Sequence, residues 1–166
     1  RVLSAEECLN LLQNTEMAPI CAVPSASHTY SIAGEGSLTP SSLFTLSPVH
    51  CAAGIALSSD LMTATCKTNN RCMVLGSQCF TEGKHYWEVV VNDCDYGTVF
   101  IGVAARLAGS SHQCWRDYGY VNNRTFQDHA SECYYGVQYC KGDTIGVLLD
   151  MDVGELSFLK IGKEFY

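Results

Sequence analysis

HYWEVVVND, residues 85–93, is the clearest indication of secondary structure in this chain. Aromatic and β-branched residues fill most of it, which favours a β-strand. Successive side chains of a strand point to opposite faces, so either Tyr86 or Trp87 must face a core. The residues at 92–97 have the composition of a hairpin loop. GTVFIGVAA, residues 97–105, then predicts the next strand.

Further strand patterns lie on both sides of this stretch, at 54–60, 61–70, 72–77, 133–139, 143–152 and 155–162. Turn residues separate them. Only residues 4–15 predict a helix, because Ser4 and Glu7 form a capping box beside an apolar face. Strands that follow one another without intervening helices indicate an all-β antiparallel sandwich or barrel rather than a βαβ fold.

The composition narrows the functional class. The chain has 166 residues, which fits one domain, and its charged fraction of 16% lies below the typical ~25%. The formal net charge of −7 argues against a nucleic-acid partner and against binding to an anionic membrane. No run of ~18 apolar residues occurs, so no membrane-spanning helix is expected.

Ten cysteines are present, and none of them are spaced as Cys-x-x-Cys. This excludes zinc-ribbon, redox and iron–sulfur motifs of that spacing. A chain of this length does not need disulfides to fold, so we expect reduced thiols in a cytoplasmic protein. Several sit in apolar or aromatic runs, where cysteine behaves as a small apolar residue: Cys72, Cys79, Cys133 and Cys140.

Three segments in fixed order carry a family resemblance: VLGSQCFTEGKHYWEV (74–89), FIGVA (100–104) and KGDTIGVLLDMDVGELSF (141–158). Together they resemble a SPRY domain. Residues 46–60 resemble, more loosely, the PRY extension of tripartite-motif proteins. The resemblance implies a bent sandwich of two antiparallel sheets, similar in outline to concanavalin-like lectins.

The resemblance also sets the expected domain boundaries. Residues 46–166 form the PRY/SPRY-like sandwich, and residues 1–45 form an N-terminal helix and a linker or extension. Sheets of the family continue by one or two more strands, so the final strand is expected to be missing or supplied from elsewhere. Gly102 and Gly146 interrupt strands, and we expect another backbone or a large ring to press against each.

Catalysis and metal binding are the weaker interpretations. His129, Glu132 and Cys133 are the only local set that could serve a nucleophile, but their stretch runs into a strand. Residues 150–155 partly match a calcium loop, yet a hairpin turn explains Asp150 and Asp152 better. The histidines are too scattered for a site, so no catalytic residue, metal or cofactor is expected. An N-glycosylation sequon occurs at 123–125.

Binding through loops is the stronger interpretation, because tyrosine and tryptophan gather with asparagine in the expected connections. These residues make contact area at little cost in side-chain entropy. In SPRY domains the corresponding loops form a shallow pocket for short peptide segments of partners. Packing beneath a loop remains open for Trp115 and is favoured for Tyr120 and Tyr135. The expected partner-binding residues are Asp93, Asp95, Tyr96, Trp115, Arg116, Tyr118, Asn122, Asn123 and Arg124.

The sequence therefore predicts a non-catalytic module that binds a partner peptide or protein through loops at one end of the sandwich. The PRY-like segment favours the substrate-recognition domain of a ubiquitin ligase whose catalytic parts lie in other domains. A lectin-like or small-ligand binder that uses the same end is the alternative. A cysteine hydrolase is the third hypothesis, and it would require one abnormally reactive thiol.

Overall fold

The computed structural model describes residues 17–23, 29–35, 45–68, 72–94, 99–106, 115–128 and 131–161. Within these ranges the chain forms strands and turns, with no helix. Every pair of neighbouring strands is antiparallel. The predicted all-β antiparallel fold is confirmed.

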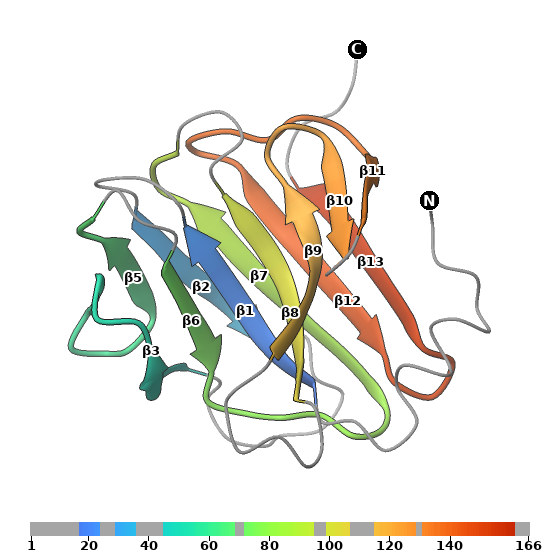
Figure 1. The fold of residues 1–166 in the computed structure, drawn as a ribbon, viewed down its shortest axis with the longest axis horizontal. Coiled ribbons are helices and arrows are strands. Elements are labelled where there is room, and N and C mark those ends of the chain that lie inside the picture. The colour runs from blue at the N-terminus through green and yellow to red at the C-terminus, as the bar shows by residue number, and fades with distance from the viewer. Residues whose placement is uncertain are drawn as a thin grey trace.

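The strands form two sheets that lie one behind the other in Figure 1. The seven-stranded sheet has the order β11 (Ser131–Tyr134), β10 (Thr125–Asp128), β9 (Trp115–Val121), β8 (Phe100–Arg106), β1 (Met17–Val23), β6 (Cys72–Gly76) and β3 (Leu46–Cys51). The six-stranded sheet has the order β13 (Glu155–Ile161), β12 (Thr144–Asp150), β7 (Lys84–Val91), β2 (Thr29–Glu35), β5 (Thr63–Cys66) and β4 (Ile55–Leu57).

The main core lies between the sheets and follows the alternation of each strand. Trp87 faces inward and is 4% exposed, while its neighbour Tyr86 is half-buried on the other face of β7. The expectation that one of these two rings faces the core is confirmed. Inward residues of both sheets contribute to the same cluster, among them Val89, Val91, Ile145, Val147 and Leu149 from one sheet and Val74, Ile101, Val103 and Tyr120 from the other. The two sheets therefore form a sandwich.

The close approach predicted at the two strand glycines is confirmed. A Cβ added at Gly102 would overlap the carbonyl oxygen of Tyr118 and lie 2.6 Å from the Cα of Gly119. A Cβ added at Gly146 would lie 2.7 Å from Oη of Tyr86. Gly102 is therefore confined by backbone on the paired strand β9, whereas Gly146 meets the end of a side chain.

We expect Gly102→Ala to lower the free energy of unfolding by at least about 1–3 kcal/mol, since the sheet must separate to admit the methyl group. Gly146→Ala is the matched control, because the Tyr86 ring can turn away from the added methyl group. Urea denaturation of both variants tests this difference. A loss in Gly102→Ala no larger than that in Gly146→Ala would contradict it.

Residues 1–45 differ from the expected helix and linker. β1 lies between β8 and β6, and β2 lies between β7 and β5, so both are internal strands of the sandwich. Residues 17–23 and 29–35 therefore belong to the sandwich. The helix expected over residues 4–15 lies outside the described residues.

Three other expectations need correction. Residues 115–120, expected to be a connection, lie in β9, and the strand β10 at 125–128 is not predicted by the sequence. The strand expected over 133–139 ends at Tyr134. Of the cysteines expected to pack as apolar residues, Cys72 is buried and Cys133 half-buried, but Cys79 and Cys140 are exposed. The cysteines whose side chains the structure describes are free thiols: Cys51, Cys66, Cys72, Cys79, Cys94, Cys133 and Cys140.

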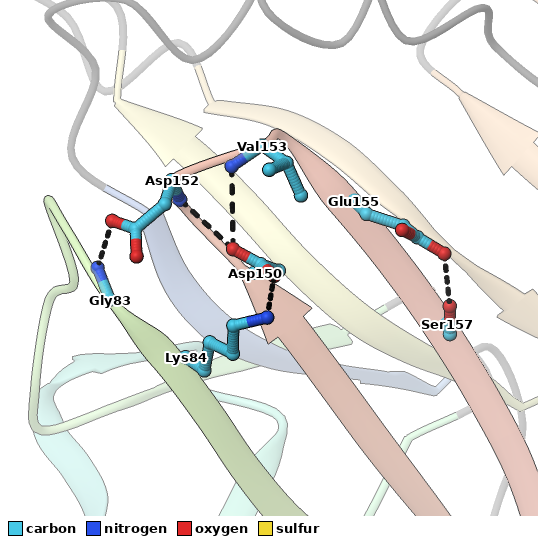
Figure 2. A network of polar contacts seen from close by, with 7 residues as sticks. All are labelled: Gly83, Lys84, Asp150, Asp152, Val153, Glu155 and Ser157. Carbon is cyan, nitrogen blue, oxygen red and sulfur yellow. Dashed lines mark hydrogen bonds and ion pairs between the residues drawn. The ribbon is translucent and has the colours of Figure 1, made fainter.

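The hairpin between β12 and β13 is closed by its own carboxylates (Figure 2). Oδ1 of Asp150 accepts the backbone N–H groups of Asp152 and Val153 at 3.1 and 3.3 Å. Asp152 in turn accepts the N–H of Gly83 at 2.8 Å, which joins the turn to the start of β7. The expectation that Asp150 and Asp152 serve as turn residues is confirmed.

The second oxygen of Asp150 binds the ammonium group of Lys84 at 2.7 Å. This hydrogen bond lowers the pKa of Asp150 below its ordinary value of 3.8. A lowered pKa in the folded state stabilises the fold above the ordinary value, and this stabilisation is lost as the pH falls through the folded-state pKa. We expect Asp150→Asn to destabilise the protein at neutral pH, with the difference from wild type shrinking in acid. Thermal unfolding at a series of pH values measures it, and a difference that does not change with pH would contradict this account.

Candidate functional site

The structure brings four of the expected partner-binding residues to one end of the sandwich, at the top of Figure 1. β7 ends there before Asp93, and β9 turns into β10 through Asn122, Asn123 and Arg124. The pairing of Phe100 with Val121 places the start of β8 beside the end of β9. We call this the loop end.

The other expected residues lie elsewhere. Trp115 and Arg116 begin β9 at the opposite end, because Trp115 pairs with Arg106 at the end of β8. A strand rises ~3.3 Å per residue, so the full length of β9 separates these two positions from the loop end. Tyr118 lies in the middle of β9 and is 5% exposed. The side chains of Trp115 and Arg116, together with residues 95 and 96, fall outside the described part of the chain.

Asn122 ties two of the loops together. Its Oδ1 accepts the N–H of Val99 at 3.1 Å, and its own N–H donates to the carbonyl oxygen of Val99 at 3.1 Å. The residue is 1% exposed. Asn122 therefore fixes the start of β8 against the turn at 122–124, and a partner cannot reach its side chain without local opening.

The turn itself presents Arg124 to solvent. Arg124 has a φ of 72°, and its carbonyl oxygen accepts the N–H of Tyr135 at 2.9 Å. The hydroxyl of Thr125 donates to Oδ1 of Asn123 at 2.6 Å. These bonds hold the turn in one conformation, which leaves the Arg124 side chain exposed.

An aromatic cluster supports the loops from below. The ring of Tyr120 contacts those of Tyr135, Tyr139 and Phe158 in tilted or edge-on arrangements, with centroids 4.9–5.6 Å apart. Oη of Tyr139 lies 2.9 Å from the carbonyl oxygens of both Val99 and Tyr120, which share its proton. Tyr120 is buried and Tyr135 half-buried, so the packing role favoured for both is confirmed.

Residues 135–143 form the third loop, which is tied down at both of its ends. The N–H of Gly142 donates to the carbonyl oxygen of Val91 at 2.7 Å, and the N–H of Val91 donates to that of Asp143 at 2.9 Å. Oδ2 of Asp143 accepts the N–H of Cys140 at 2.8 Å and pairs with Lys160 of β13 at 2.7 Å. Lys160 also donates to the carbonyl oxygen of Gln138 at 2.9 Å. Backbone and side-chain contacts therefore connect this loop to both β7 and β13.

The solvent-facing groups of these loops define a surface of mixed charge with one prominent ring. Tyr134 is 90% exposed at the end of edge strand β11, where it pairs with Thr125 beside the turn. Lys141 and Asp93 form an exposed ion pair at 3.6 Å, which contributes little to stability. We call the side chains of Asp93, Asn123, Arg124, Tyr134 and Lys141 the loop surface.

Sequence reasoning left Lys141 and Tyr134 out of the site residues and did not anticipate Asp143 and Lys160. The signal for the loop at 135–143 lies in its two glycines, since Gly136 and Gly142 have φ values of 57° and 88°. Such values favour glycine and mark a tightly bent connection rather than a strand. Nothing in the sequence pairs Asp143 with Lys160.

The described residues offer no cluster of three or more histidine, cysteine, aspartate or glutamate side chains that could hold a metal ion. His129 lies outside them, so the set with Glu132 and Cys133 stays a sequence hypothesis. Burial raises the pKa of the Cys94 thiol, so Cys94 lacks the abnormally reactive thiol that a cysteine hydrolase would require. In the part of the chain that the structure covers, no helix has the length and apolar character needed to cross a membrane.

Comparison with known families shows a match to a model described as the SPRY domain, over residues 84–166, from the start of β7 to the last residue of the chain. No solved structure matches the chain. The matched range contains the turn at 122–124, the loop at 135–143 and every residue of the loop surface.

Proposed function

The chain belongs to the SPRY domain family, whose members are generally non-catalytic protein-interaction modules, and we propose that it binds a partner peptide or protein through the loop surface. The observation that carries the proposal is that the turn at 122–124, the loop at 135–143 and residues 92–94 after β7 converge at one end of the sandwich and are joined to it by hydrogen bonds. Hydrogen bonds of Asn122, Tyr139 and Asp143 fix the loops, while Arg124 and Tyr134 remain exposed. A surface that is ordered before binding loses little conformational entropy when a partner docks.

The chemistry of the loop surface favours a peptide segment with both polar and apolar groups. Tyr134 offers a large ring, and Arg124 offers hydrogen-bond donors for carboxylate or carbonyl oxygens. Tyrosine and arginine are common among the residues that dominate binding energies at protein interfaces. Of the partner-binding residues expected from the sequence, Asp93, Asn123 and Arg124 are proposed as contact residues. Tyr118 and Asn122 are assigned to the support beneath them.

Selection of peptides from a display library on the wild-type chain, followed by titration of the best binder, tests this proposal. We expect Arg124→Ala and Tyr134→Ala each to weaken binding of the selected peptide at least about tenfold, the loss typical of a dominant contact. Melting temperatures should stay near that of the wild type, because both side chains are exposed.

Val49→Ala is the matched control for these variants. Val49 is 81% exposed on β3, at the opposite edge of the seven-stranded sheet from β11. The control should bind the selected peptide like the wild type. A peptide whose affinity survives both loop changes would count against the loop surface.

A role in ubiquitin ligation is the finer part of the proposal. It is supported by the resemblance of residues 46–60 to a PRY extension, part of which forms β3 and β4. A cytoplasmic location is supported by the free thiols of the described residues, which persist in a reducing compartment. Expression of the parent protein with wild-type or Arg124→Ala loops, with ubiquitination of a captured partner as readout, tests the ligase role. Equal ubiquitination in both would contradict it.

A further inference from the structure

Two cysteines lie on neighbouring segments at the loop end. Cys94 follows β7, and Cys140 lies in the loop at 135–143. The backbone bonds of Val91 to Gly142 and Asp143 hold these two segments side by side. The side chains of Asp93 and Lys141, the residues directly next to the two cysteines, form an ion pair at 3.6 Å.

This arrangement places the two thiols within reach of each other. Cys94 directly follows Asp93 and Cys140 directly precedes Lys141, so the ion pair of those two side chains brings the cysteines to adjacent positions on the two segments. A disulfide requires roughly 4.4–6.8 Å between the two Cα atoms, a range that includes the separation of opposed residues on neighbouring antiparallel segments.

We propose that Cys94 and Cys140 form a reversible disulfide when the protein meets a peroxide. The bond would join the segment after β7 covalently to the loop at 135–143, beneath Asp93 and Lys141. Any effect of this bond on partner binding rests on the proposed function, since these loops carry the loop surface. Formation of the bond itself does not depend on any partner.

The two thiols have different exposure, which assigns them different roles. Cys140 is exposed, and its thiol lies 3.4 Å from Oδ2 of Asp143. Its sulfur attacks the peroxide, giving a sulfenic acid and one molecule of water. The half-buried Cys94 thiol then attacks that sulfur, forming the S–S bond and releasing a second molecule of water. Two thiols and one hydrogen peroxide thus give one disulfide and two waters, and a dithiol reductant reverses the change.

The other thiols provide internal controls. Cys79 is exposed, like Cys140, and lies on the chain between β6 and β7, away from the loop at 135–143. Cys51 and Cys72 lie on the paired strands β3 and β6, but Cys72 is 7% exposed and shares a hydrogen bond with Thr68 at 3.3 Å. Burial shields that pair from a dissolved oxidant, so we expect it to stay reduced longer.

Hydrogen peroxide treatment of the whole chain, followed by alkylation, proteolysis and mass spectrometry, tests the proposal. We expect a cross-linked peptide that joins Cys94 to Cys140 and a whole-chain mass lower by two hydrogen atoms, both reversed by dithiothreitol. Cys94→Ser and Cys140→Ser should each abolish the cross-link, and Cys79→Ser should retain it. Recovery of Cys140 as sulfinic acid together with an alkylated Cys94, which shows that Cys94 had stayed reduced, would overturn the proposal.

Hydrogen exchange provides a second readout. We expect amide exchange in residues 135–143 to slow in the oxidised wild type and to stay unchanged in peroxide-treated Cys140→Ser. Unaltered exchange in a chain that carries the cross-link would overturn the claim that the bond constrains the loop. Neither readout uses a binding partner, so failure of the peptide selection leaves both results intact.

Discussion

Replacing Trp87 with alanine is expected to lower the free energy of unfolding by about 3–5 kcal/mol, the range for deleting a large aromatic ring from a core. Trp87 is 4% exposed on β7, where it pairs with Val147 of β12 and Glu35 of β2. Its ring lies 6.2 Å from that of Phe80 between ring centroids. No neighbouring strand can collapse into the space without breaking its own pairing, so most of the cavity would remain.

Tyr86→Phe is the control for this prediction, one residue away on the other face of the same strand. It removes only the hydroxyl that donates to Glu88 at 2.8 Å, and we expect a loss of about 1 kcal/mol. Guanidinium denaturation of both variants measures the difference. Similar losses for the two would show that the space between the sheets is not the main source of stability.

The sequence predicts the strands whose own residues show a clear β-strand pattern. β7, β8, β12 and β13 appear as runs of apolar or β-branched residues between turn residues. The sequence does not predict β1, because Pro19 lies inside it and proline normally argues against an internal strand. Here Pro19 pairs with Val103 of β8 within a strand that is internal to the sheet. The partner strands, which no local pattern reveals, override the local signal.

β9 was missed for a different reason. Its sequence WRDYGYV mixes charge and glycine with aromatic rings, and this composition is also typical of binding loops. The useful signal was the alternation of Tyr118 and Tyr120, which places both rings on the core-facing side. Gly119 between them accommodates the ring of Phe100, since a Cβ there would lie 2.6 Å from that ring.

The candidate site was predictable only in part, because its support consists of polar contacts between residues far apart in sequence. Asparagine at 122 is read from sequence as a surface residue, yet its amide oxygen binds the backbone of Val99 in the interior. The exposed turn at Arg124 was expected, since turn residues cluster there. Which polar groups face a partner and which hold the loops is decided by tertiary contacts.

Asp143→Ala is expected to lower the free energy of unfolding by about 3–5 kcal/mol, the cost of breaking a buried ion pair from one side. The side chain of Asp143 is 1% exposed and that of Lys160 11% exposed, with 2.7 Å between Oδ2 and Nζ. Removal of the carboxylate leaves the ammonium group of Lys160 and the N–H of Cys140 without this acceptor. Amide exchange in the loop at 135–143 should also become faster than in the wild type.

Two comparisons separate the buried charge from surface effects. Lys141→Ala breaks the exposed pair with Asp93, whose side chains are 69% and 45% exposed, and we expect a loss of no more than about 1 kcal/mol. The double change Asp143→Leu with Lys160→Met removes both charges, so it should recover part of the loss seen in Asp143→Ala. If Asp143→Ala cost no more than Lys141→Ala, the loop would be held by its backbone bonds to Val91 and not by the ion pair. The loop at 135–143 would then keep its shape in the variant, and its amide exchange would match that of the wild type.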